Sequence, residues 1–413
     1  MDPQVSNQLN TSLDTAIERT QSYLFREQYS DGFWWGELES NPTMEAEFLL
    51  LHYFLGINDE KKFLKLSNHI KSQQREDGTW GQYYGAPGDL STSVECYLAL
   101  KIAGYSENEE SMLKAKDFIC SKGGIEKTRV FTKIWLSLVD QWKWEGVPIM
   151  PAELILLPNW SPINIYEFSS WARSTIVPLL ILMDKKPVRS LPKNLRVDEL
   201  FSDGPNSVDY SVKSPSNQIG WETFFFATDQ VLRLLDKLPI KPTRDLALKK
   251  SEQWILEHQE ADGSWGGIQP PWVYSIMALY AAGYDLESPV IKKALHGFKS
   301  FEIEDSYSLR VQACVSPIWD TGLAIISLLD SGIKPNDFRL QRAGKWLIDK
   351  QIKSEGDWHV KANNVRSGGW AFEFENEHYP DIDDAAVVAT ALQKIDLKDN
   401  EKKSKSIARC VQW

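Results

Sequence analysis

Cysteine is scarce in this chain of 413 residues, and its four copies lie far apart at Cys96, Cys120, Cys314 and Cys410. No two of them have the C-x-x-C spacing of a zinc or redox site, so we predict neither a disulfide framework nor a cysteine-bound metal. The first residues lack a basic segment followed by an apolar core, which predicts no secretory signal. Together these absences favour a reducing compartment.

Long apolar runs and basic clusters are also missing. The longest apolar stretch, residues 175–183, is far shorter than a membrane span and contains Pro178. The formal net charge is −11, and no cluster of Lys and Arg offsets it. This charge argues against a nucleic-acid binder. We therefore expect a chain that neither crosses a membrane nor binds nucleic acid.

Tryptophan, by contrast, is abundant, with 17 copies beside 17 Phe and 14 Tyr. The chain is too long for one ordinary hydrophobic core, so two domains are expected. With 42% hydrophobic and 25% charged residues, its composition is that of a globular protein. So many indoles need an explanation beyond core filling.

A short pattern of Gln, Gly and Trp occurs four times. A helical pattern precedes each Gln, another follows each Trp, and Asp-Gly marks a turn in three copies. A Gln side chain can bond the backbone groups that helix ends leave open, and a Trp ring can cover the joint. We therefore interpret the copies as structural links between helices, not as catalytic groups. They are Gln28-x3-Gly32-x-Trp34, Gln74-x3-Gly78-x-Trp80, Gln259-x3-Gly263-x-Trp265 and Gln351-x4-Gly356-x-Trp358.

The repeat also bears on the end of the chain. An aromatic residue stands five positions before the Gln in three copies, at Tyr23, Trp254 and Trp346. Residues 408–413 resemble the segment that precedes the Gln in the other copies, but the sequence ends before that Gln. We expect the 413 residues to be the N-terminal part of a longer protein.

Apolar residues at helical spacing dominate the chain, for example over residues 45–51, 94–103 and 321–329. Almost no stretch has the alternating pattern of a strand. The predicted fold class is all-α, with paired helices stacked as an array or closed into a toroid.

One acidic stretch, Tyr379-Pro380-Asp381-Ile382-Asp383-Asp384, directly precedes an apolar run. Pro380 suits the approach to a helix and Asp381 suits its N-cap. Asp383 and Asp384 would then lie in the first turn, where the helix dipole favours negative charge. On these residues alone a capped helix start is favoured. The alternative is a buried acid that keeps its proton because its neighbours cannot all ionise together.

The repeat and the acidic stretch together resemble the squalene–hopene cyclases, bacterial members of the triterpene cyclase family, which carry repeated Gln-Trp motifs and an Asp-x-Asp-Asp motif. The match runs almost from end to end of the chain and covers about the first two-thirds of a family member. Further matching segments are Trp34-Trp35-Gly36, Met44-Glu45-Ala46-Glu47, Tyr166-Glu167-Phe168-x2-Trp171-Ala172-Arg173, Gly266-Gly267-Ile268-Gln269-Pro270-Pro271-Trp272 and Ser316-Pro317-Ile318-Trp319-Asp320-Thr321-Gly322.

The resemblance implies two α/α barrels, the second inserted into the first, with the substrate cavity between them. Residues 1–38 and 315–413 would belong to the catalytic barrel, and residues 39–314 would form the inserted barrel. Since much of the catalytic barrel would then be missing, the 413 residues alone are expected not to turn over squalene.

The implied reaction is the cyclisation of squalene to a pentacyclic triterpene, hopene or hopanol, without cofactor or metal. It begins with protonation of a terminal alkene by a strong acid. The family's acid matches Asp383, with Asp381 and Asp384 holding it and tuning its proton, and the family's His partner lies beyond Trp413. Burial and neighbouring carboxylates help the acid to keep its proton, whereas hydrogen bonds and the helix end help it to let go.

The carbocations that follow need electron-rich surfaces that are poor nucleophiles. Aromatic faces supply them, at on the order of 2 kcal/mol or more for each desolvated contact. Without the resemblance, core packing would be the expectation for each aromatic residue. By their positions in the family motifs, Trp171, Trp319, Phe372 and Tyr379 are implied at the cavity, with Trp370 as a further wall candidate and Ile268, Pro270, Glu47 and Gln269 at its far end. Glu47 and Gln269 are implied in ordering the water that ends or deprotonates the cascade.

The resemblance also implies contact with a membrane. Four aromatic residues, Trp221, Phe224, Phe225 and Phe226, match a region that dips into one leaflet around the mouth of the substrate channel. Phe168 and Ile176 are implied in narrowing that channel. The implied location is monotopic, on the cytoplasmic side of a bacterial membrane. The implied partners are squalene and the membrane surface, and no nucleic acid is expected. Whether the protein forms a homodimer is left undecided by the sequence.

Other functions remain open at this point. A class II diterpene cyclase uses the same acid on a prenyl diphosphate, but it needs Mg²⁺ and a basic pocket, for which no Lys/Arg cluster is found. Oxidosqualene cyclases carry Asp-Cys-Thr-Ala-Glu where this chain has Asp381-Ile382-Asp383-Asp384-Ala385. The triple-Asp form suits an alkene, because opening an epoxide takes a weaker acid. A non-catalytic helical-repeat binding module is the third alternative, and a zinc-dependent version is disfavoured because no His has ligand spacing with a Cys.

Overall fold

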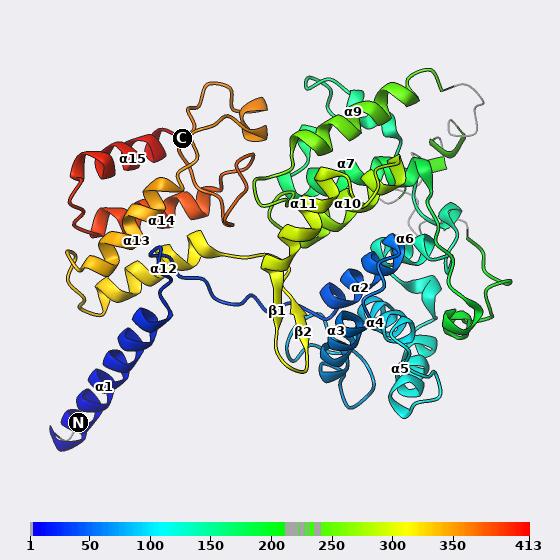
Figure 1. The fold of residues 1–413 in the computed structure, drawn as a ribbon, viewed down its shortest axis with the longest axis horizontal. Helices are drawn as coiled ribbons and strands as arrows, with labels where there is room; N and C mark the ends of the chain where they lie inside the picture. Colours follow the sequence, from blue (N-terminus) through cyan, green and yellow to red (C-terminus); the bar gives the residue numbers. More distant parts are fainter. Residues whose placement is uncertain (1–2, 211–222, 224–226, 228, 231, 235–240) are drawn as a thin grey trace. The chain divides into compact units, whose positions relative to one another are not determined.

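A computed structural model describes residues 3–210, 223, 227, 229–230, 232–234 and 241–413, with side chains considered from residue 12 onward (Figure 1). The chain divides into two compact units. Unit 1 consists of Met1–Leu38 and Cys314–Trp413, and unit 2 consists of Glu39–Ala313.

Unit 2 alternates helices that are mostly buried with helices that bury a single face. The mostly buried helices are α2 (Thr43–Leu55), α4 (Leu90–Ile102), α6 (Val130–Leu138), α7 (Ser170–Lys185) and α10 (Gln269–Ala282). The others are α3 (Glu60–Ser72), α5 (Glu110–Ser121), α9 (Arg244–Glu257) and α11 (Pro289–Gly297). Every residue of α2 except Tyr53 is buried, whereas α3 buries only Leu66, Ser67 and Ile70. A helix that is apolar all round belongs inside, so unit 2 has an inner and an outer set of helices.

These helices pack both against their neighbours in the sequence and against more distant helices. Helix α2 packs against α3, α4 and α10, and α7 packs against α9 and α10. Two short strands, β1 (Glu302–Glu304) and β2 (Leu309–Val311), form an antiparallel hairpin near the end of the unit. Short 3₁₀ helices complete the unit: η1 (Ile125–Lys127), η2 (Trp144–Gly146), η3 (Ala152–Leu156), η4 (Ile165–Glu167), η5 (Lys193–Leu195), η6 (Asp198–Leu200) and η7 (Phe298–Phe301).

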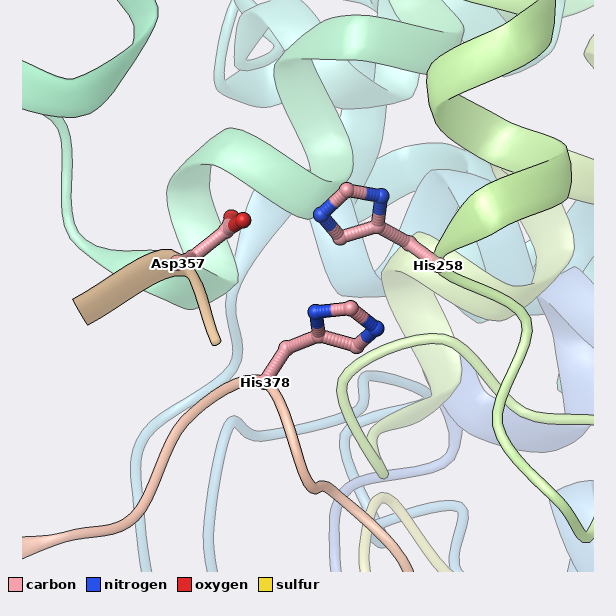
Figure 2. Close-up of side chains that lie close together, drawn as sticks. All are labelled: His258, Asp357 and His378. Atoms are coloured by element: carbon pink, nitrogen blue, oxygen red, sulfur yellow. The ribbon is translucent and has the colours of Figure 1, made fainter. Parts of the chain in front are cut away.

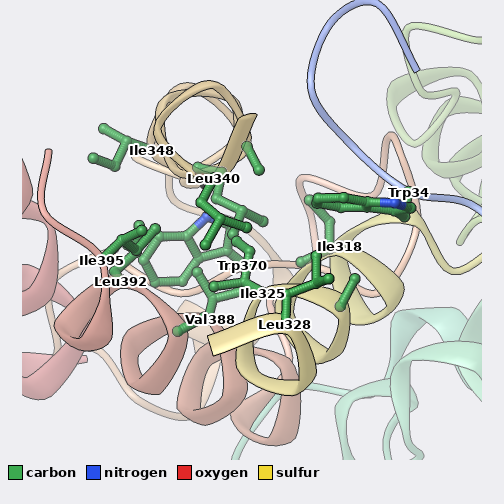
Figure 3. Packing of buried hydrophobic residues seen from close by; sticks show 14 of the residues in the cluster. Trp34, Ile318, Ile325, Leu328, Leu340, Ile348, Trp370, Val388, Leu392 and Ile395 are labelled. Atoms are coloured by element: carbon green, nitrogen blue, oxygen red, sulfur yellow. Dashed lines mark hydrogen bonds between the residues drawn. The ribbon is translucent and has the colours of Figure 1, made fainter. Parts of the chain in front are cut away.

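Unit 1 is built from α1 (Pro3–Glu27), α12 (Pro317–Asp330), α13 (Phe338–Asp349), η8 (Asp357–Val360), α14 (Ile382–Lys394) and α15 (Asn400–Gln412). Helices α12 and α14 pack against each other and enclose an apolar core with α13. Figure 3 shows Trp370 at the centre of this core, among Leu340, Ile325 and Val388. Each large apolar side chain buried there contributes about 1.5–3 kcal/mol to stability.

The Gln-Gly-Trp pattern links helices through paired hydrogen bonds. Gln74 Nε2 donates to the carbonyl of Gly78 at 2.9 Å and to that of Ser111, on the next outer helix, at 3.0 Å. The indole Nε1 of Trp80 donates to the carbonyl of Ile70, four residues before the Gln, at 2.7 Å. The copies at Gln28 and Gln259 make the same set of bonds. The prediction that these residues are structural links is confirmed for all three.

The fourth copy corrects the sequence match. Gln351 Nε2 donates to the carbonyl of Gly368 at 2.7 Å, and Trp370 Nε1 donates to the carbonyl of Leu347 at 2.6 Å. The assignment of Gly356 and Trp358 to this copy was therefore wrong. The assignment of Trp370 as a cavity wall was also wrong, because this ring is fully buried in the core of unit 1.

The all-α prediction is confirmed. Among the residues that the structure describes, β1 and β2 form the only sheet. None of the described helices combines the length and apolar character needed to cross a bilayer.

Candidate active-site residues

The acidic stretch of unit 1 starts helix α14 as predicted. Asp381 has extended backbone angles and its side chain accepts a hydrogen bond from the backbone N–H of Asp383 at 2.7 Å, which makes it the N-cap. Asp383 and Asp384 lie in the first turn. The N–H of Asp381 donates to the carbonyl of Trp370 at 2.7 Å, so the helix start is fixed to the segment that carries the fourth Trp.

The three carboxylates have different surroundings. Asp384 is buried, whereas Asp383 is exposed and Asp381 is half-buried. Burial, together with the charges of Asp381 and Asp383, raises the pKa of Asp384 to about 7. Within unit 1 the buried acid of this motif is thus Asp384. The role of proton donor for Asp383 stays a prediction.

A fourth carboxyl group, missed by the sequence analysis, lies beside these three. Glu373 is buried, and its pKa is raised to about 8, first by burial and also by the charges of Asp384 and Asp381. A hydrogen bond from Asn376 Nδ2 to Glu373 Oε2 at 3.2 Å opposes this rise. Its only signal in the sequence was a Glu placed between two aromatic residues, Phe372 and Phe374.

Two aromatic residues predicted at the cavity lie near each other in unit 1. The ring centroids of Trp319, on α12, and Phe372 are 6.5 Å apart, with an interplanar angle of 43°. Both rings are half-buried and so keep part of their faces accessible. Tyr379 is also half-buried, and its N–H donates to the carbonyl of Asn376 at 3.2 Å in the turn that leads to α14.

In unit 2, Glu47 lies inside the helix set, on α2. Its pKa is raised well above the usual range by burial and by the charge of Glu95, on α4, and Arg129 opposes this rise. Arg129 approaches Glu95 at 3.3 Å, and the hydroxyl of Thr132 donates to the same oxygen of Glu95. The neighbouring phenol of Tyr274 also has a raised pKa because of its burial and the two glutamates.

Glu95, Arg129, Thr132 and Tyr274 were not identified from the sequence. A signal was present at Glu95, which stands alone in an otherwise apolar helical run. Its partners come from distant parts of the sequence, and only the packing of α2, α4, α6 and α10 brings them together.

Gln269 lies at the start of α10 and is fully buried. Its side-chain Nε2 donates to the carbonyl of Met44 at 2.8 Å, which joins α10 to the start of α2. Its amide oxygen accepts no hydrogen bond from any residue that the structure describes. Ile268 and Pro270 flank it and are half-buried.

The residues predicted near the channel are partly accessible. Phe168 and Trp171 are 37% and 38% exposed, and Ile176, on α7, is half-buried. Trp171 lies beside the turn that leads to Gln269, since a Cβ atom at Gly266 would be 3.7 Å from Trp171 Cδ1. The predicted membrane residues Trp221, Phe224, Phe225 and Phe226 lie outside the described residues.

Figure 2 shows the side chains of His258, Asp357 and His378. Asp357 and His378 both belong to unit 1, and their ligand atoms lie within 4.8 Å of each other. His258 belongs to unit 2, where its ring stacks on Trp254 with centroids 3.7 Å apart. One carboxylate and one imidazole in unit 1 are fewer than the three or four protein ligands of a typical zinc site, so we assign no metal there.

Two family profiles match the chain. Residues 17–307 match the squalene-hopene cyclase N-terminal domain, and residues 315–413 match the squalene-hopene cyclase C-terminal domain.

Individual relatives are similar over nearly the whole chain. The squalene–hopene cyclase of Alicyclobacillus acidocaldarius is 43% identical over 97% of this chain and 62% of its own length. The dammaradiene synthase of Dryopteris crassirhizoma is 40% identical over 97% of this chain and 58% of its own length. The chain thus spans about six-tenths of the length of these relatives. A solved structure, ent-copalyl diphosphate synthase from Arabidopsis thaliana, has a TM-score of 0.35 at 13% identity over 95% of this chain and 51% of that one, too low for any conclusion.

Proposed function

The chain belongs to the squalene–hopene cyclase family, and from this premise we propose that the full-length protein cyclises squalene to a pentacyclic triterpene, hopene or hopanol. The observation that carries this proposal is the start of α14, where an exposed Asp383 stands next to a buried Asp384 whose pKa is raised to about 7. A carboxyl group can protonate an alkene only if it still carries its proton at neutral pH, and a buried protonated neighbour can supply that proton.

Asp383 is the proposed donor to the terminal alkene. Among the three aspartates of the motif, Asp383 alone has an exposed side chain in unit 1. The neighbouring Asp384 is buried and carries a proton that it can transfer to Asp383. Asp381 is held as the N-cap and so fixes the first turn. The positive end of the helix stabilises the carboxylate that remains after transfer, which favours release of the proton.

The proposed role of Trp319 and Phe372 is to stabilise carbocations. Their half-buried rings present π-faces and no nucleophilic atom, so they can stabilise a positive charge without capturing it. Trp171 and Tyr379 are proposed in the same role, and Ile268 and Pro270 in shaping the site.

We propose that polar residues of unit 2 end the carbocation cascade. The open amide oxygen of Gln269 can accept a hydrogen bond from a water molecule. Glu47 and Glu95 form a buried pair, and the carboxylate that Arg129 stabilises in this pair can accept the proton that the last cation or its captured water loses. Arg129 and Thr132 hold Glu95 and keep this pair partly charged.

The test is to incubate the full-length protein with squalene in detergent and analyse the products by mass spectrometry. We expect a C30 isomer or its hydrate from the unaltered protein, and a loss of at least about 10²-fold in rate for Asp383→Asn. Asp396→Asn, an exposed aspartate on the loop after α14, serves as the control. Cyclisation that survives Asp383→Asn would remove this residue from the proposed role, and no cyclic product at all would refute the function.

The product is the narrower part of the proposal, because the relatives include a dammaradiene synthase as well as squalene–hopene cyclases. The same product analysis decides between these skeletons. A basic diphosphate site, which the alternative class II diterpene cyclase needs, has no counterpart among the described residues at the acid motif, where the neighbours that shift the pKa of Asp384 are aspartates.

We also propose peripheral binding to the cytoplasmic face of a bacterial membrane through the segment that contains Trp221 and Phe224 to Phe226, with Phe168 and Ile176 at the channel. The partial exposure of Phe168 supports this proposal. Flotation of the full-length protein with vesicles at physiological salt tests it, and a protein that stays wholly at the bottom of the gradient contradicts it.

A further inference from the structure

A pocket of about 370 Å³ lies in unit 1 and is lined in part by residues 373–377, the segment that precedes the acid motif. Its rim includes the exposed residues Lys353, Ser354 and Glu377, so the pocket reaches the surface. One of its lining residues is the buried Glu373. Nothing in the proposed cyclisation uses this carboxyl group.

The backbone places Glu373 close to the start of α14. The hydrogen bond from Asp381 N–H to the Trp370 carbonyl pairs the segment before Glu373 with the N-cap of the helix. Glu373 is 2% exposed, and only its Oε2 has a hydrogen-bond donor, Asn376 Nδ2. Neither Glu373 Oε1 nor Asp384 Oδ1 forms a hydrogen bond with any described residue, although both atoms are buried. Two buried carboxyl groups with open oxygens thus lie near each other, and one of them lines a pocket that reaches the surface.

Burial and the charged groups around Glu373 favour the protonated form of its carboxyl group. The carboxylates of Asp384 and Asp381 raise its pKa, and burial raises it more, to about 8. The one cation at the pocket wall that the structure pairs with an acid there is Lys350, whose Nζ donates to Glu375 at 2.7 Å and to the Phe374 carbonyl at 3.0 Å. Cys314, another titratable neighbour, has its pKa raised to about 11 by burial and by the charge of Glu373, so it stays a neutral thiol.

We propose that Glu373 is a positioning residue for proton supply, which passes protons from the surface-reaching pocket to Asp384 and so restores the acid after each cyclisation. This inference rests on the proposed function. Cyclisation takes one proton from the acid at the first alkene and releases one when the last cation is deprotonated. The acid is therefore left as a carboxylate after every turnover and must be refilled from solvent.

Asp383 loses a proton to the alkene carbon, and the Asp384 carboxyl gives its proton to the Asp383 carboxylate. Glu373 gives its proton to the Asp384 carboxylate and then takes one from water in the pocket. No group is oxidised or reduced, and the only bonds that change are those to the moving proton.

The first experiment compares the first turnover with later turnovers in the full-length protein, using rapid mixing with squalene in detergent. Glu373→Gln keeps the size of the side chain but cannot carry a proton. Its first turnover should run at the rate of the unaltered protein, because the buried Asp384, whose pKa is raised to about 7, already holds the proton that the first transfer needs. Later turnovers should then slow by at least about tenfold. The control Glu355→Gln removes an exposed glutamate of the same unit outside the pocket and should give no such burst.

The second measurement follows the proton itself. The infrared spectrum of the unaltered protein at pH 7 should contain a protonated-carboxyl band that is absent from Glu373→Gln. In the unaltered protein kcat should fall as the pH rises through the pKa of Glu373, and the variant should lose this limb of its profile. If Glu373→Gln fails to fold, Glu373→Asp, which still carries a proton, replaces it and should retain the limb with an intermediate rate.

Three results would overturn the inference: equal rates in first and later turnovers of Glu373→Gln, an unchanged infrared band, or a uniform slowing with the pH profile intact. The last is what a merely structural role predicts. If the unaltered protein makes no cyclic product, the proposed function fails instead, so the two failures can be told apart.

Discussion

The buried carboxyl groups of unit 1 and of unit 2 differ in what lies beside them. In unit 1 the α14 acid cluster, defined as Glu373, Asp381, Asp383 and Asp384, contains acids alone, and the charges that shift the pKa of Asp384 are those of two aspartates. In unit 2 the Arg129 cluster, defined as Glu47, Glu95, Arg129 and Thr132, supplies its glutamates with a guanidinium group and a hydroxyl donor. Both clusters are buried in part, but only the second contains its own countercharge.

The difference separates two uses of a buried acid. Without a countercharge, burial favours the protonated form, so Asp384 and Glu373 keep protons that they can pass on. With a countercharge, part of the charge is retained: burial raises the pKa of Glu95, but Arg129 and Thr132 both oppose this rise. The comparison predicts opposite responses when a charge is removed from each cluster.

The largest effect is expected in unit 2. Arg129→Met should reduce the free energy of unfolding by about 3–5 kcal/mol at neutral pH, because it leaves buried glutamates without their cation. The loss should shrink on acidification. The folded-state pKa of Glu47 is raised, so its proton is bound more tightly in the folded protein and low pH favours folding.

Denaturant unfolding of the full-length protein at two pH values measures this effect. The control is Lys61→Met, an exposed cation on α3, which should change the free energy of unfolding by less than about 0.5 kcal/mol. An Arg129→Met loss that is the same at both pH values would contradict the assignment of charge in the Arg129 cluster.

An effect of opposite sign is expected in unit 1. The pKa of Asp384 rises from its ordinary 3.8 to about 7 on folding, so its contribution to stability is present below pH 3.8 and is lost as the pH rises to 7. Since Asn carries no charge, Asp384→Asn should match the unaltered protein at pH 4. At pH 8 the Asp384→Asn variant should be more stable than the unaltered protein by roughly 3 kcal/mol. This figure takes about 1.36 kcal/mol for each pKa unit of the rise, after one unit is subtracted from the rise.

The same unfolding measurement at pH 4 and pH 8 tests this prediction, with the exposed Asp396→Asn as the matched control. A destabilised Asp384→Asn at pH 8 would mean that the carboxylate of Asp384 has a partner and that the two clusters are alike.

The smallest effect on stability is expected when a hydrogen-bond donor of the Arg129 cluster is removed. Thr132→Val should reduce the free energy of unfolding by about 1.5–2 kcal/mol, because a buried hydroxyl that donates to the Glu95 carboxylate is lost. Thr390→Val, on the exposed face of α14, removes a hydroxyl that bonds only its own helix at 2.8 Å and should change little. Equal losses in the two variants would show that the hydroxyl of Thr132 supports no charge.

Local chemistry made the α14 start predictable. Asp381 caps the helix through its own side chain, and the residues that decide this lie within three positions of one another. The three regular Gln-Gly-Trp copies were predictable for the same reason, since each turn is closed by residues a few positions apart. The all-α fold followed from the helical spacing of apolar residues over most of the chain.

What depends on tertiary packing was not predictable. Glu373 looks like a surface residue in the sequence, and it became a buried acid only through the pairing of Trp370 with Asp381. Arg129 reaches Glu95 because α4 and α6 pack together, across 34 residues of sequence. The fourth Trp was misassigned because the other three copies close short turns, and Trp358 stands at nearly the same distance from its Gln.

That fourth copy bears on how such chains can change over time. The Gln side chain and its glycine carbonyl are 4 residues apart at Gln28 but 17 apart at Gln351, yet both make the same hydrogen bond at 2.7 Å. The linkage therefore joins the two helices across loops of different length. Insertions at the exposed residues 363 and 364 of the loop between Gln351 and Gly368 should leave the register of α13 and the place of Trp370 in the core unchanged. The loop is a natural place for a lineage to acquire new surface features, or for an engineer to add a tag.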